Sequence, residues 1–224
     1  MPTRTSRLRG AREPSLFPPE ATVASIELLD SGGDLRLYRG WLARDRADAT
    51  LAAIAATTTW RAERRKMYDR FVDVPRLQAW FGDDRERPFP PELAVLRREL
   101  EALAGTPFSY VLLNRYRDGN DSVAWHHDRE VATRPQPVIA SLSLGATRAF
   151  DVRSIADRSR VVSVDLDHGD LVIMRGSSQS AYEHRIAKDH RISGERINLT
   201  FRLLPDCATS RARAEVAGIA RRRV

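Results

Sequence analysis

The chain has 224 residues, of which 42% are hydrophobic and 30% are charged. This length suits one well-buried domain and leaves little chain for a second. It contains no run of about 18 apolar residues and no charged-then-apolar leader, so we expect neither a membrane span nor secretion. The single cysteine, Cys207, cannot form an internal disulfide and fits a reducing compartment, so we expect a cytoplasmic protein.

The formal net charge of +7 comes from the two ends of the chain. Residues 1–19 carry four arginines against one glutamate, a net +3, and residues 208–224 carry five against one, a net +4. The domain between them, residues 20–207, is therefore formally neutral. We expect a basic disordered arm and a basic tail, which would attract a polyanion non-specifically or simply keep the protein soluble.

The first part of the domain, residues 20–107, predicts two helices. One spans residues 45–57, which are rich in Ala and Leu, and the other spans residues 91–104, with Pro91 at its start and Gly105 as its C-cap. The other expected segments are short strands at 23–29 and 35–38, a basic stretch with aromatics at 60–70, a segment with a Gly-Asp turn at 74–84 and a Pro-rich loop at 85–91.

The second part, residues 108–204, consists of short β-rich runs separated by turns. The runs lie at 108–116, 137–145, 147–153, 160–166, 169–175 and 196–204. Such spacing favours an antiparallel barrel or sandwich over a βαβ sheet. We therefore predict an α+β, mainly β fold, a jelly-roll of about eight strands with the helices packed outside.

All five histidines fall in this β-rich part. On a strand, His126 and Asp128 share a face and can bind one ion while His127 points away. This H-x-D pattern alone is weak, but His184 downstream completes two histidines and one carboxylate, the facial triad of non-haem Fe(II) oxygenases. The two remaining histidines, which we expect to be exposed, are His168 and His190.

Polar and apolar residues alternate along residues 196–202. A period of two places one set on each face of a strand. The polar set is Arg196, Asn198, Thr200 and Arg202, and the apolar set is Ile197, Leu199 and Phe201. The Cα atoms of the two arginines would lie about 20 Å apart, yet their long side chains can converge on the two ends of a small diacid. The alternative is an exposed strand face.

Four motifs occur in a fixed order across roughly residues 75–204. They are Asn114, Tyr116, Asp118, Gly119 and Asp121; then His126, Asp128 and Glu130; then His184; then Arg196, Asn198, Thr200 and Arg202. In this order they resemble the AlkB family of Fe(II)/2-oxoglutarate dioxygenases. The resemblance implies a double-stranded β-helix, with Fe(II), 2-oxoglutarate and O₂ as the reacting cofactors, and a hairpin that recognises nucleotides.

The resemblance also implies roles for individual residues. His126, Asp128 and His184 would bind Fe(II). The residues implied for 2-oxoglutarate are Arg196, Tyr116 and Asn198 at its distal carboxylate, Arg202 and Asn114 near its metal-bound end, and Thr200 on the same strand. Those implied for substrate are Tyr68 as the finger of the hairpin, Arg70 and Arg76 beside it, and Glu130 at the exocyclic amine of the base. An ordinary surface hairpin remains the alternative for residues around Tyr68.

The activity that the resemblance implies is oxidative demethylation of 1-methyladenine or 3-methylcytosine in DNA, which releases formaldehyde and succinate. The expected partner is nucleic acid, DNA before RNA, bound by a monomer. Residues 85–92, RERPFPPE, depart from the family's aromatic segment, and only Phe89 could replace an aromatic wall there. A second reading is therefore an AlkB-like dioxygenase acting on RNA, protein or a small molecule. A third is a basic nucleic-acid-binding β-barrel without activity, which the triad and the arginine strand disfavour.

Overall fold

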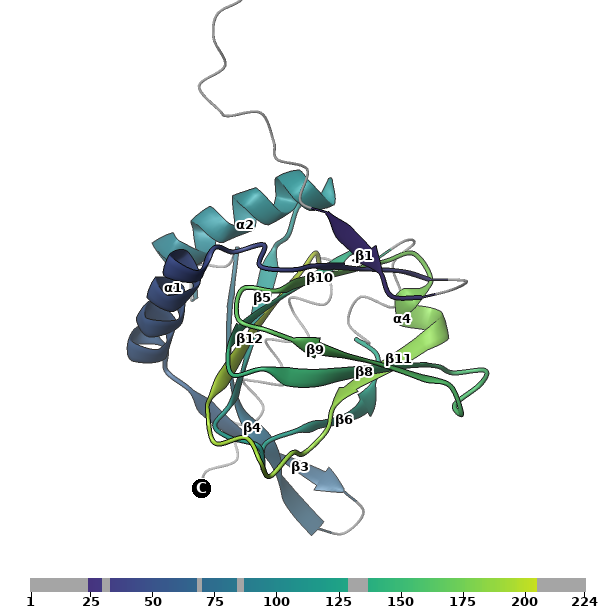
Figure 1. Ribbon diagram of the computed structural model, residues 1–224. Coiled ribbons are helices and arrows are strands. Elements are labelled where there is room, and N and C mark those ends of the chain that lie inside the picture. The colour runs from purple at the N-terminus through teal and green to yellow at the C-terminus, as the bar shows by residue number, and fades with distance from the viewer. Residues whose placement is uncertain (1–23, 30–32, 68–69, 84–86, 129–136, 205–224) are drawn as a thin grey trace, which may run out of the picture.

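The computed structural model in Figure 1 describes residues 24–29, 33–67, 70–83, 87–128 and 137–204, and for residues 65–67 and 70–72 it describes the backbone alone. The basic arm and the basic tail lie outside these residues. Tyr68, Glu130 and the side chain of Arg70 also lie outside them.

Two helices form where the sequence predicts them. Helix α1 spans Arg44–Thr57 and helix α2 spans Pro91–Ala104. Proline occupies the first turn of α2, where its missing N–H costs nothing. Gly105 ends the helix in the left-handed conformation, with φ 68°, which glycine adopts without steric cost.

The rest of the described chain is mainly β-structure, with one short helix, α4, at Ser178–Ala181. The strands before α2 are β1 Ser25–Glu27, β2 Asp34–Tyr38, β3 Arg61–Met67 and β4 Arg70–Gly82. Those after it are β5 Tyr110–Tyr116, β6 Val123–His126, β7 Ile139–Gly145, β8 Arg148–Ser154, β9 Val161–Leu166, β10 Leu171–Arg175, β11 Tyr182–Ile186 and β12 Arg196–Arg202.

These strands form two antiparallel sheets that face each other. The larger has the order β1-β2-β10-β7-β12-β5-β4-β3, and the smaller has the order β6-β11-β8-β9. Helices α1 and α2 lie together against the outer side of the larger sheet, as Figure 1 shows. The jelly-roll with helices packed outside is therefore confirmed.

The two faces of β12 point into different parts of the interior. Ile197, Leu199 and Phe201 are fully buried in the core that the helices cover. Helix α2 contributes leucines at helical spacing to the same core, namely Leu93, Leu96 and Leu100. The polar face of β12 is left to look toward the smaller sheet. Its residues are also buried, so the exposed-face alternative is wrong.

Two expectations about local structure are corrected. Strand β6 ends at His126, so Asp128 lies in the loop beyond it and does not share a strand face with His126. His168 is not exposed: its Nδ1 accepts a hydrogen bond from the Gly145 N–H at 2.8 Å, and its Nε2 lies 3.1 Å from Asp48. Its side chain is only 16% exposed because it links the β9–β10 turn to α1 and to β7. His190 is exposed, as expected.

The basic stretch at 60–70 becomes one arm of a hairpin. Strand β3 pairs with β4, which continues without interruption to pair with β5. Strand β4 is longer than the predicted segment, with 13 residues, and it places Gln78 opposite Asn114 of β5, with Arg76 two residues earlier on the same strand. None of the helices in the described ranges has the length and apolar character that a membrane span requires.

Candidate active site

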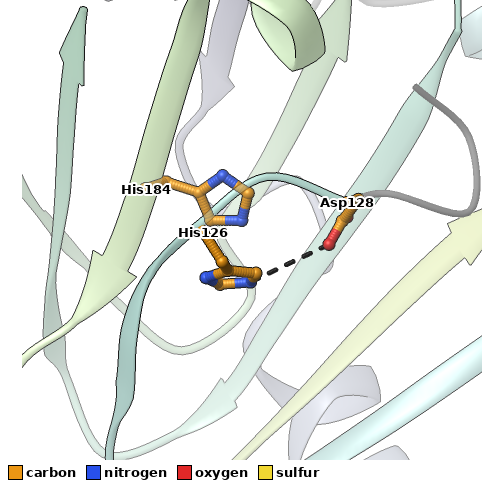
Figure 2. Close-up of side chains that lie close together, drawn as sticks. All are labelled: His126, Asp128 and His184. Atoms are coloured by element: carbon orange, nitrogen blue, oxygen red, sulfur yellow. Dashed lines mark ion pairs between the residues drawn. The ribbon is translucent and has the colours of Figure 1, made fainter. Parts of the chain in front are cut away.

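Three candidate metal ligands come together between the two sheets. His126 on β6 and His184 on β11 are direct cross-strand partners, with ring centroids 4.4 Å apart. Asp128 follows from the loop after β6, with its Oδ1 3.8 Å from the Nε2 of His126 (Figure 2). One ligand atom from each residue lies within 4.8 Å of the others, which suits binding to a single ion. Within the described part of the chain, no other group of histidine, cysteine and acidic side chains meets this criterion.

Arg202 sets the charge of the candidate aspartate ligand. Its Nη2 lies 3.0 Å from Asp128 Oδ2, and both side chains are 6% exposed. Burial of Asp128, the largest influence, opposes its ionisation, but the neighbouring groups, with the charged Arg202 first among them, outweigh burial and lower the pKa of this carboxyl. The carboxylate is therefore ready to bind a cation.

The His184 ring is neutral over the physiological pH range. Its burial, and then the neighbouring His126, lower its pKa to about 3 from an ordinary 6.5. Phe150 covers the ring from β8, with centroids 5.4 Å apart. A neutral imidazole is the form that binds a metal.

Gln179 holds the loop that carries Asp128, and no pattern in the sequence singled it out. It lies on α4, is 1% exposed, and accepts a hydrogen bond from the Asp128 N–H at 2.9 Å. Its own amide donates to Met174 Sδ at 3.2 Å. A helix of four residues is too short to show a periodic pattern in the sequence, so this contact could be recognised only in the structure.

The polar face of β12 forms one wall of the site. Asn198 donates to the Ser141 Oγ at 2.8 Å and to the Leu142 carbonyl at 3.1 Å. Thr200 donates to Asn198 Oδ1 at 2.9 Å. These bonds fix the side chains between Arg196 at one end of the strand and Arg202 at the other.

Arg196 is a buried cation with unused donors. It is 2% exposed, and its Nη2 donates to Ser143 Oγ at 2.9 Å. Its Nε and Nη1 are buried without a hydrogen-bond partner among the described residues. Burial lowers its pKa to about 10, so the guanidinium remains charged at neutral pH. Buried donors on a charge are costly to leave unpaired, so this end of the cavity suits an anion.

Tyr116 and Asn114 line the same wall from β5. Tyr116 is the cross-strand partner of Arg196, whose Cζ lies 5.3 Å from the tyrosine ring centre. Asn114 Oδ1 accepts hydrogen bonds from Arg76 Nε at 2.8 Å and from Gln78 Nε2 at 2.7 Å. Arg76 therefore faces the site.

One cavity of about 500 Å³ joins these groups. It is lined by the three candidate metal ligands, by the polar face of β12, and by Asn114, Tyr116 and Arg76. The structure thus brings together every metal and cofactor residue that the sequence predicted. Phe89 does not reach the cavity: it stacks on Phe201, 6.4 Å between centroids, in the core on the helix side of the sheet.

Comparison with known proteins agrees with this geometry. Residues 34–202 match the family model described as the 2OG-Fe(II) oxygenase superfamily. The chain is 36% identical over 219 residues to alpha-ketoglutarate-dependent dioxygenase alkB homolog 3 of Rattus norvegicus, covering 89% of this chain and 74% of the relative. The chain belongs to the AlkB family of Fe(II)/2-oxoglutarate-dependent dioxygenases. The corresponding Homo sapiens protein is 34% identical over 219 residues, covering 89% of this chain and 76% of its own.

A second group of relatives matches a smaller part of the chain. The Homo sapiens protein named DNA oxidative demethylase ALKBH2 is 32% identical over 157 residues, covering 62% of this chain and 60% of its own. The solved structure of OsALKBH1 superposes with a TM-score of 0.55 at 18% identity, covering 75% of this chain and 97% of that one, and supports the fold alone. As a member of the family shown by the 2OG-Fe(II) oxygenase match, the enzyme uses Fe(II) and 2-oxoglutarate. The buried donors of Arg196 and the donor set of the triad fit these two groups.

Proposed function

We propose that this AlkB-family dioxygenase removes methyl groups oxidatively from N-alkylated bases in nucleic acid, and that 1-methyladenine and 3-methylcytosine in DNA are its substrates. The observation that carries the proposal is the single cavity that joins the His126–Asp128–His184 triad to the unpaired donors of Arg196. Relatives named DNA oxidative demethylase support DNA as the substrate. Formaldehyde and succinate are the expected products.

The two ends of the cavity have different tasks in this proposal. His126, Asp128 and His184 hold Fe(II), and Arg196 binds the distal carboxylate of 2-oxoglutarate with its free Nε and Nη1 donors. Arg202 remains at the metal end, because its guanidinium is committed to Asp128. The bound cofactors with O₂ supply the oxidation of an N-methyl group, whereas the chain binds, orients and excludes water.

An aromatic pair next to the metal site offers a surface for the base. Trp80 on β4 stacks on Tyr110 of β5, with ring centroids 5.8 Å apart and an interplanar angle of 28°. Tyr110 is the cross-strand partner of Arg202, so the pair lies on the same face of the larger sheet as Arg202, beyond the residues that line the cavity. The Cζ of Arg87 lies 4.7 Å from the Trp80 ring centre. Such a platform stacks a base and places a cation near its phosphate.

We propose this platform as the aromatic wall for which residues 85–92 offered only Phe89. Trp80 lies in the predicted 74–84 segment, but only the register of β4 against β5 brings it onto the cavity face. Arg76 lies on the same strand, nearer the β3–β4 hairpin, and lines the cavity. We propose that both residues contact the substrate.

The β3–β4 hairpin is the proposed element that separates a base from its neighbours. Tyr68 as its finger, Arg70 near it and Glu130 at the exocyclic amine are carried over from the family resemblance, and these three side chains lie outside the described residues. Replacing Tyr68 by alanine should reduce activity on duplex more than on single-stranded substrate, since only a duplex base must be flipped out. Equal losses on both substrates would refute this role.

The proposal is tested by product stoichiometry. With Fe(II), 2-oxoglutarate and ascorbate, the enzyme should release formaldehyde from an oligonucleotide that contains 3-methylcytosine and form an equal amount of succinate from 2-oxoglutarate. The unmethylated oligonucleotide, and the His126→Ala variant, should release no formaldehyde. DNA and RNA oligonucleotides of the same sequence decide between the two substrate classes. Succinate without formaldehyde on every nucleic acid tested would overturn the proposal.

A further inference from the structure

A second buried arginine stands behind the proposed 2-oxoglutarate site. Arg148 is the first residue of β8 in the smaller sheet and is 1% exposed. Its Cζ lies 5.5 Å from the ring centre of Tyr116, on β5 of the larger sheet. The same ring lies 5.3 Å from Arg196 Cζ. Arg148 therefore reaches across the interior, and two guanidinium groups lie against one tyrosine ring.

Arg148 joins the two loops that close this end of the barrel. Its Nη1 donates to the Asp118 carbonyl at 3.1 Å, and its Nη2 donates to the carbonyls of Asp121 at 2.9 Å and Ala187 at 2.6 Å. The first two carbonyls belong to the loop after β5 and the third to the segment after β11.

The closeness of these loops depends on Gly119. Its N–H donates to the Ile192 carbonyl at 2.8 Å, and its carbonyl accepts from the Asp189 N–H at 2.9 Å. A Cβ at this position would overlap the backbone carbonyl of Asp189. Glycine thus permits the loop approach that Arg148 bridges.

The charge of Arg148 is not neutralised by direct contact. Within the described residues its hydrogen-bond acceptors are all backbone carbonyls, and it forms no ion pair. Asp121 nearby is already paired with Arg117, Nη2 to Oδ1 at 2.8 Å. Arg148 and Arg196 carry like charges against the same tyrosine ring and therefore repel each other, which adds to the effect of burial in lowering the Arg196 pKa. An anion bound at Arg196 relieves this repulsion.

We propose that Arg148 is a positioning residue for 2-oxoglutarate, which holds Tyr116 against Arg196 and adds a second positive charge behind the distal carboxylate. It does not touch the cosubstrate. Its effect is therefore specific to the carboxylate that binds at Arg196, and a 2-oxo acid that lacks this group should not respond to it. The inference rests on the cosubstrate placement in the proposed function, but not on the methylated substrate.

The test measures binding by titration calorimetry on the full chain loaded with Mn(II), which prevents turnover. Two probes are compared: 2-oxoglutarate and 2-oxopentanoate, a five-carbon 2-oxo acid without the distal carboxylate. Arg148→Gln should raise the Kd of 2-oxoglutarate about tenfold, because one nearby charge is lost. It should leave the Kd of 2-oxopentanoate within about twofold, since this acid lacks the distal carboxylate on which the charge of Arg148 acts.

Arg117→Gln is the matched control. Arg117 anchors the same loop through Asp121, but its side chain is 56% exposed. This variant should bind both acids within about twofold of the unmodified protein. Should Arg148→Gln not fold, Arg148→Lys carries the test. Its shorter reach moves the charge away from the carboxylate and should weaken 2-oxoglutarate about threefold, again without affecting 2-oxopentanoate.

Unchanged 2-oxoglutarate binding in the Arg148 variants would overturn the inference. Equal weakening of both acids would also overturn it, because that result means a general collapse of the loops. Failure of the proposed demethylation is distinguishable, since it would show as absent formaldehyde release while selective 2-oxoglutarate binding persists.

Discussion

Arg202 and Asp128 form an ion pair inside the cavity, with Nη2 and Oδ2 3.0 Å apart. The arginine comes from the central strand of the larger sheet and the aspartate from the loop after β6 in the smaller sheet. This contact therefore connects the polar face of β12 to the candidate metal ligands. It also fixes the direction of the site, since Arg202 marks the metal end and Arg196 the opposite end of β12.

Replacing Arg202 by methionine should weaken metal binding. Asp128 would lose the partner that orients it and favours its ionised form, and loss of such an outer contact typically costs about 10- to 100-fold in metal affinity. The measurement is equilibrium dialysis with Mn(II) in place of Fe(II). Arg175→Met is a control on β10, which β7 separates from β12 in the same sheet. Metal affinity unchanged by Arg202→Met would contradict the orienting role.

Replacing His126 by alanine should reduce 2-oxoglutarate turnover by more than about 100-fold, because a ligand is lost outright rather than a supporting contact. The fold should persist, since the side chain is 35% exposed and contributes little to the core. Succinate formation and the thermal unfolding curve are measured together. His190→Ala, at an exposed histidine outside the site, should retain full turnover. Substantial turnover in His126→Ala would refute the metal assignment.

Replacing Gln179 by leucine should weaken metal binding about tenfold. Leucine fills a similar volume, but the Asp128 N–H loses its acceptor, and the loop is no longer held in position. Metal affinity is measured as for Arg202. Ser180→Ala is the control on the same short helix, since Ser180 is exposed and bonds only to Ser177. Identical behaviour of the two variants would argue against a positioning role.

Replacing Trp80 by alanine should lower kcat/KM for a methylated oligonucleotide about tenfold, which is the scale of losing one base-stacking contact. Turnover of 2-oxoglutarate without nucleic acid should stay within about twofold, since Trp80 lies beyond the cofactor groups. Steady-state assays with and without oligonucleotide separate the two effects. Loss of both activities together would mean that Trp80 supports the fold instead.

The low pKa of His184 predicts how the metal-free protein responds to acid. In the unfolded chain this histidine takes up a proton near pH 6.5, whereas the folded state resists protonation until about pH 3. The unfolded state therefore binds more protons between these values, and the free energy of unfolding should fall as pH decreases from 6.5. In the presence of a chelator, the Tm of the unmodified protein should drop more steeply from pH 7 to pH 5 than that of His184→Gln. Parallel curves would count against the buried neutral ring.

The sequence was informative wherever a pattern is local. The alternation along residues 196–202 predicted both faces of β12, and Pro91 and Gly105 marked the ends of α2. The H-x-D spacing pointed to two candidate ligands for the wrong local reason, because Asp128 lies past the end of β6 and does not share a strand face with His126.

The contacts that the sequence did not predict are long-range. Gln179 meets Asp128 across 51 residues, and Arg148 meets Ala187 across 39. Trp80 comes onto the same sheet face as Arg202 through the register of β4 on β5, and His168 is partly covered through its contact with α1. None of these depends on a periodic pattern or a turn signal, so each requires the three-dimensional arrangement.

The most direct test of the proposed function is intact-mass analysis of a 3-methylcytosine oligonucleotide after incubation with the enzyme. We predict that the oligonucleotide loses the mass of one methylene group per lesion, only when Fe(II) and 2-oxoglutarate are both present, and that His126→Ala leaves the mass unchanged. An unchanged mass with the complete reaction mixture, while succinate accumulates, would contradict demethylation of this base and leave the dioxygenase with another substrate.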